Sequence, residues 1–189
     1  GIGNVKLDYS PTNKEKWYYN AQYQSSTNDF SSTVSSITAA NSSVFETISK
    51  ADNVSVKQYL EWHKSYNEQH TTTFVINQAY DNNTPKNQWF TDKPFFVGLI
   101  PLQNDVSYTI NQIKKVRNNS IDALFKHYWI INNFNHLYTN VGNNLGTSSF
   151  TTAEKQILTN GTINDFASAG FGNDVKYKLN DAYAGVEYK

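Results

Sequence analysis

The absence of cysteine is the feature that most constrains how this 189-residue chain folds. Without cysteine the chain has no disulfide framework, no thiolate nucleophile and no cysteine-ligated zinc. Its stability must come from apolar side chains that leave water, and 11 Phe, 13 Tyr and 4 Trp supply them. A chain of this length fits one domain, so we expect a single globular, extracytoplasmic domain over residues 1–189.

The polar part of the composition is uncharged. Charged residues make up 17% of the chain, against about 25% in typical domains, while 25 Asn, 17 Ser and 17 Thr supply polarity. Fifteen Lys against one Arg indicate an AT-rich genome. Together with the missing cysteine, this composition is typical of exported bacterial proteins, so we expect an extracellular or cell-surface location.

Charge and hydropathy exclude two classes of partner. The net charge is +0, and nucleic-acid binding needs a basic excess or a concentrated basic face. The dense basic run from Lys114 to Arg117 is interpreted as the solvent-exposed side of a helix. The longest apolar run, Phe95 to Leu102, has about eight residues where a membrane helix needs about twenty. The sequence therefore predicts no nucleic-acid partner and no transmembrane segment.

Alternating apolar and polar residues predict strands at both ends of the chain. Val5, Leu7 and Tyr9 alternate with polar residues, and a turn near 11–13 leads into a second alternating segment. The sequence therefore predicts an N-terminal hairpin over residues 4–24. A similar alternation predicts strands over residues 174–188, and we expect the two terminal regions to pair.

The centre of the chain has helical spacing instead. Ile121, Leu124 and Tyr128 recur at intervals of three and four residues, and similar spacing occurs from 31 to 70. These patterns predict a helix-rich centre, about 31–70 and 105–169, with a polar loop over 81–93 between the two parts. Helices between terminal strands predict an α+β fold.

Histidines are the first candidates for chemistry. His63 and His70 are seven residues apart, which is about 10.5 Å along a helix and too far to share one ion. His127 and His136 are nine apart, so they face opposite sides of a helix. The sequence therefore predicts no metal site, and no motif indicates a cofactor or a catalytic residue.

A pair of glutamates gives one enzymatic alternative. Glu61 and Glu68 lie near Trp62 and Tyr66, and paired carboxylates with aromatic neighbours are typical of glycoside-hydrolase clefts. Two glutamates on the exposed side of an amphipathic helix explain the same pattern. A small glycan-active hydrolase therefore stays an alternative, and a non-catalytic role is favoured.

Four aromatic residues are the candidate binding residues. Trp89 and Phe90 lie in the predicted polar loop, and Trp17 and Tyr19 lie on the second predicted strand. Exposed aromatic rings stack on sugars and anchor protein interfaces. We therefore expect an exported or cell-surface binding or adhesion domain that contacts a glycan, a wall polymer or a protein. The alternative is a structural subunit that self-assembles into a surface layer or filament by exchanging its N-terminal strand.

Overall fold

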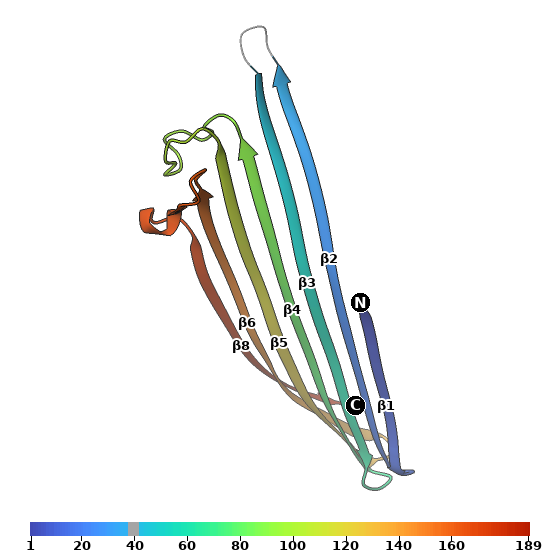
Figure 1. Ribbon diagram of the computed structural model, residues 1–189. Helices are drawn as coiled ribbons and strands as arrows, with labels where there is room; N and C mark the ends of the chain where they lie inside the picture. The colour runs from blue at the N-terminus through green and yellow to red at the C-terminus, as the bar shows by residue number, and fades with distance from the viewer. Residues whose placement is uncertain (38–41) are drawn as a thin grey trace.

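The computed structural model describes residues 1–37 and 42–189. The chain forms one antiparallel sheet of long, inclined strands (Figure 1). The strands follow the order β1-β2-β3-β4-β5-β6, and both β7 and β8 pair with β6. The elements are β1 (Ile2–Thr12), β2 (Glu15–Ile37), β3 (Ser42–Ser65), β4 (His70–Thr91), β5 (Tyr108–Asn132), β6 (Asn135–Ile157), β7 (Ile163–Asp165), the 3-10 helix η1 (Phe166–Ala169) and β8 (Asn173–Tyr188).

The central strands are unusually long. Strands β2 to β6 have 22 to 25 residues each, where about five or six is the norm. Aromatic and β-branched residues favour the extended backbone along them. The register between β2 and β3 is continuous from Glu15 opposite Lys64 to Ile37 opposite Ser42. One continuous ladder therefore holds β2 and β3 together along this whole stretch.

The two ends of the sheet differ. At the lower end of Figure 1, short turns at 13–14, 66–69 and 133–134 join consecutive strands. Asn67 shapes one of them, because its Oδ1 accepts hydrogen bonds from the backbone N–H groups of Gln69 (2.9 Å) and His70 (2.8 Å). At the upper end, the 92–107 connection and the segment with β7 and η1 are much longer.

A small buried cluster lies where these longer segments meet the sheet. Its buried apolar side chains are Tyr108, Ile110 and Phe166; the other buried apolar side chain among the described residues, Val75, lies in the part of β4 nearer the short turns. Gln156 is fully buried and exchanges two hydrogen bonds with the backbone of Gln103, at 2.9 and 2.8 Å. These bonds attach the 92–107 segment to β6. The rest of the sheet has no second layer of described residues packed against it.

The predicted α+β fold is wrong. The expected helix-rich centre, 31–70 and 105–169, instead forms the end of β2 and strands β3, β5, β6 and β7. The 3-10 helix η1 is the only helical element among the described residues, and positions 38–41 of the first predicted region lie outside them. Helical spacing arose because apolar residues lie on both faces of the strands: Ile121 and Phe125 point to one face, and Leu124 and Tyr128 to the other.

Two smaller predictions are also wrong. Most of the predicted 81–93 loop belongs to β4, and the terminal strands do not pair with each other, since β1 pairs with β2 and β8 with β6. The predicted strand regions 4–24 and 174–188 lie within β1, β2 and β8. The described residues form no helix with the length and hydrophobicity that crossing a membrane requires.

The contact between β6 and β8 can be tested at Gly142. A Cβ at this position would lie 2.3 Å from Cζ of Tyr183, whose hydroxyl donates a hydrogen bond to Asp122 (3.2 Å). We expect Gly142→Ala to displace this ring and lower the free energy of unfolding by about 1–3 kcal/mol, as overpacking does. Denaturant titration measures the change. Gly3→Ala is the matched control, because a Cβ there meets nothing within 4 Å; equal losses in both variants would contradict the prediction.

Candidate functional site

The sheet has two chemically different faces. Side chains alternate between the faces along each strand, and directly paired residues share a face. On one face, the part nearest the short turns carries a continuous apolar surface, which we call the apolar belt. Its members are Val5, Leu7, Ala21, Val56, Leu60, Phe74, Ile76, Ile121, Ala123, Phe125, Val141, Leu145, Ala184 and Val186.

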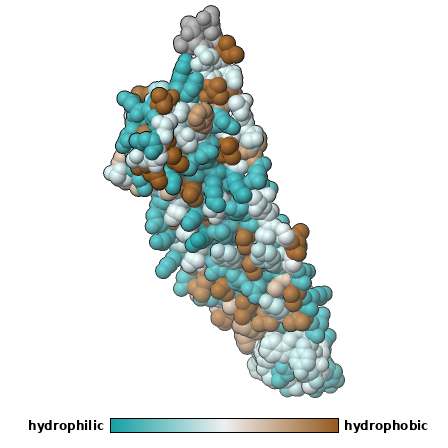
Figure 2. Space-filling model, viewed as in Figure 1, coloured by the Kyte–Doolittle hydropathy of each residue, from teal (hydrophilic) through white to brown (hydrophobic). Residues whose placement is uncertain are grey.

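The apolar belt has a defined extent along the strands, and it carries no formal charge. It spans residues 54–62 of β3, 121–129 of β5 and 137–145 of β6, about nine residues or about 27 Å along each strand. None of the positions facing the belt side in these spans is Asp, Glu, Lys or Arg. Eight of its side chains are exposed, among them Val141 at 58% and Val186 at 74%, and the other six are half-buried. Figure 2 shows hydrophobic residues gathered across the lower half of the visible face.

An aromatic row borders the apolar belt on its turn side. Its members are Tyr9, Trp17, Trp62, Trp129 and Tyr188. Trp17, Trp62 and Trp129 each lie within a few residues of a short turn. Trp129 stacks on His70 with ring centroids 5.5 Å apart. Five of the seven long strands thus place a large ring at the same border.

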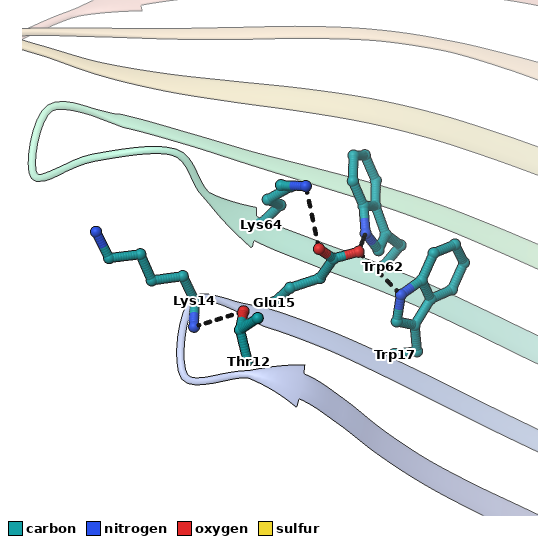
Figure 3. A network of polar contacts seen from close by, with 6 residues as sticks. All are labelled: Thr12, Lys14, Glu15, Trp17, Trp62 and Lys64. Atoms are coloured by element: carbon teal, nitrogen blue, oxygen red, sulfur yellow. Dashed lines mark hydrogen bonds and ion pairs between the residues drawn. The ribbon is translucent and has the colours of Figure 1, made fainter.

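The indole N–H groups of two tryptophans in this row point toward the turns. Trp17 and Trp62 lie side by side, with ring centroids 5.8 Å apart, and both donate to Oε1 of Glu15, at 3.2 and 3.0 Å (Figure 3). The other carboxylate oxygen of Glu15 pairs with Lys64 at 3.0 Å. The Trp62 donor and then Lys64 lower the pKa of the Glu15 carboxyl. The two rings therefore have an apolar side on the belt and a polar edge at the turns.

A ladder of hydrogen bonds joins polar side chains on the belt side, although the buried Oδ1 of Asn143, on the same side, has no hydrogen-bond partner. The Tyr19 hydroxyl donates to Gln58 (2.7 Å), Gln58 donates to Gln78 (2.9 Å), and Gln78 donates to Asn119 (2.9 Å). This ladder crosses four strands without using a charged group. Lateral pairing of this kind lowers the cost of keeping amides on an apolar surface.

The opposite face, which we call the polar face, carries the charges. At the level of the belt it presents Lys57, Glu61, Asp122, Lys126 and Asp181. Open pockets of about 350 and 470 Å³ lie along it, lined mainly by Asn, Gln, Ser and other polar side chains. The sheet therefore separates an uncharged surface from a hydrophilic one at the same height.

The predicted binding residues lie in two separate places. Trp17 is in the aromatic row and Tyr19 in the belt ladder, both on β2. Trp89 and Phe90 lie near the far end of β4, about 50 Å along the strand from the level of Trp17. They are half-buried strand residues opposite Ile110 and Thr109, not parts of an exposed loop. The four aromatic residues do not form one site.

The candidate metal and acid residues are also rearranged. His70 lies against His127 from another strand, with Nδ1 and Nε2 3.2 Å apart, while His63 points to the polar face and contacts Thr73 at 3.0 Å. The described residues contain no group of three potential metal ligands.

The two candidate acids do not lie on one helix face. Glu61 accepts a hydrogen bond from Tyr59 on the polar face of β3, and Glu68 lies in the following turn.

The prediction of helices over 31–70 and 105–169 did not reveal the apolar belt. Alternation was visible in the sequence at Val5, Leu7 and Tyr9. The same period of two continues through residues 121–129, where apolar residues on the polar face hide it. Only the register brings seven such strands into one surface.

Comparisons with known proteins add little. No protein-family model matches the sequence, and no curated protein matches it. A solved structure that it resembles is the ferric yersiniabactin uptake receptor FyuA from Yersinia pestis, at 11% identity and a TM-score of 0.30. The match covers 99% of this chain and 34% of the receptor, so the chain spans about a third of that protein's length.

The Glu15 contacts can be tested by acid titration. Because its donors lower the pKa of Glu15, the carboxylate stabilises the fold at neutral pH, and this stabilisation is lost as pH falls through the lowered pKa. We expect the indole N–H resonances of Trp17 and Trp62 to shift together with this titration, below the usual glutamate range. In Glu15→Gln the shift should disappear, and in the turn variant Glu68→Gln it should persist. A shift that survives Glu15→Gln would show that another group titrates.

Proposed function

We propose that the apolar belt contacts the hydrocarbon core of a lipid bilayer. The strands would then cross a membrane as one wall of a larger antiparallel sheet, and the polar face would line an aqueous space. One observation carries this proposal: the belt is exposed and free of charged side chains, while the charges at the same height lie on the opposite face.

An exposed belt of this size requires a cover. Each Å² of apolar surface removed from water contributes about 25 cal/mol, and a sheet with one apolar face normally packs it against a second layer. The described residues supply no such layer. The belt therefore has to be covered by lipid or by another protein.

Lipid fits the belt better than a second protein layer does. A strand crosses the hydrocarbon region in about 9–11 tilted residues, and the belt spans about nine on each of β3, β5 and β6. Aromatic residues gather at membrane–water interfaces with their polar edges toward water. The indoles of Trp17 and Trp62 have this arrangement, with Glu15 and Lys64 on the turn side.

The two ends of the sheet support the same proposal. Membrane sheets typically have short turns on one side and longer segments on the other, with alternating apolar and polar side chains between them. Here the short turns lie beside the aromatic row, and the 92–107 segment, β7 and η1 lie at the far end. The central strands also continue well beyond the belt in that direction.

The sheet edges require further strands. In hydrocarbon every backbone N–H and C=O must be paired, but one edge of β1 and one edge of β8 are unpaired among the described residues. We propose that other strands, from the same polypeptide or from other copies, complete the ladder. The self-assembly alternative corresponds to pairing between copies of this chain through the free edges of β1 and β8.

Export and contact with polar solutes are also part of this proposal. Export is required for a membrane sheet with extracytoplasmic segments, and the Asn- and Gln-lined polar face suits uncharged polar solutes such as sugars. The expected absence of a transmembrane segment rested on the helical criterion of about twenty apolar residues. Strands that cross by alternation do not meet that criterion. Nothing on the polar face favours the hydrolase alternative.

The absence of cysteine makes the main test direct. Each single cysteine introduced at positions 121–129 of β5 would be the only thiol in the chain. After reconstitution in phosphatidylcholine vesicles, we expect thiols at 121, 123, 125, 127 and 129 to resist an aqueous maleimide and those at 122, 124, 126 and 128 to react. Reactivity that does not alternate, in chains that are folded by circular dichroism, would contradict the proposal.

A charge placed in the belt gives an independent test. We expect Val141→Lys to lower the free energy of unfolding from vesicles by about 2–4 kcal/mol, the cost of a cation at the bilayer centre on a lipid-facing strand position. Its neighbour Asn140 faces the other side of β6. Asn140→Lys should therefore cost much less, and equal costs in the two variants would argue against lipid contact.

A further inference from the structure

A basic pocket lies beside the upper border of the apolar belt, on the same face. It has a volume of about 250 Å³ and is formed by β5, β6 and β8 together with Tyr80 of β4. Its cationic side chains are Arg117, Lys176 and Lys178. We infer that this pocket binds the phosphate group of an anionic membrane lipid whose acyl chains lie on the belt, an inference that rests on the proposed function.

The strand register brings the cations together. Arg117 and Lys176 lie opposite Ser149 from its two sides, so their Cα atoms are about 10 Å apart across β6. Lys178 lies on the next rung of the same face, opposite Thr147. Three long cationic side chains from two strands therefore reach a single pocket that is floored by small hydroxyl residues of β6.

Two of these cations lack a carboxylate partner. Lys176 pairs with Asp174 at 3.6 Å, and both side chains are largely exposed. Arg117 donates through Nε to the amide oxygen of Asn82 at 3.2 Å. Within the described part of the chain, neither Arg117 nor Lys178 is in an ion pair, so the pocket keeps a net positive charge. A guanidinium with free N–H groups matches phosphate oxygens well.

The position of the pocket selects a lipid rather than a dissolved anion. On the belt side of β5, Ile121 is the belt residue farthest from the short turns. Asn119 lies one rung beyond it and Arg117 two rungs beyond it. Lys178 occupies the same rung as Asn119. This border is where headgroup phosphates lie above the hydrocarbon core, and Lys and Arg side chains reach such groups along their apolar stems.

Spin-labelled lipids test this inference. The chain is reconstituted in phosphatidylcholine vesicles that contain a trace of spin-labelled phosphatidic acid or spin-labelled phosphatidylcholine, and electron spin resonance measures the protein-bound fraction. Each cation near an anionic headgroup strengthens association about fivefold. We expect the preference for phosphatidic acid in the unmodified chain to fall at least about fivefold in Arg117→Gln/Lys178→Gln.

The control removes the same charge from the other face. Lys114 and Lys126 face the polar side of β5, so Lys114→Gln/Lys126→Gln should keep the preference. A preference that is unchanged in Arg117→Gln/Lys178→Gln overturns the inference. Loss of the preference on adding inorganic phosphate, at the ionic strength of a chloride control, overturns it in favour of a soluble anion.

The two proposals fail in different ways. If the chain enters vesicles with alternating thiol reactivity but binds both spin-labelled lipids equally, only the phosphate inference is rejected. If the reactivity does not alternate, the proposed function and the inference that rests on it are both rejected.

Discussion

The contact between the apolar belt and its surroundings is the interaction on which the rest of the structure depends. Backbone hydrogen bonds hold the strands in register, but they do not decide what covers a face. Few of the described apolar side chains are buried, so the large gain from removing apolar surface from water is not realised within the sheet. An environment that covers the belt would supply it. The aromatic row and the charge-free surface have a common explanation in such an environment.

The two faces divide the physical tasks. On the belt side, the Tyr19–Gln58–Gln78–Asn119 ladder pairs its own amides, which suits a surface where water is absent. On the polar face, charged groups and open pockets suit contact with water. Glu15 lies at the boundary between the aromatic row and the short turns. Its carboxylate accepts hydrogen bonds from two indole N–H groups of the row and pairs with the ammonium group of Lys64 on the turn side.

The sequence predicted some strands and missed others for one physical reason. Where one face of a strand is polar throughout, as around Val5, Leu7 and Tyr9, a period of two is visible. In β3, Val56 and Leu60 face the belt while Tyr59 faces the polar side, so apolar residues recur at three and four. That spacing imitates a helix. Trp89 is a candidate binding residue because it lies in a polar segment, and Trp17 because it lies on an aromatic-rich predicted strand, but composition does not show that the fold separates them.

Composition by itself determined that the chain is free of cysteine, nearly neutral and rich in aromatic residues, because these properties do not depend on conformation. The tertiary structure alone decided where those residues lie. Pairing seven long strands in register gathers uncharged residues from distant segments into the belt, and at that level it places the charged residues on the opposite face. A shift of one residue in any strand would exchange its faces. The belt, the aromatic row and the basic pocket therefore exist only through the register.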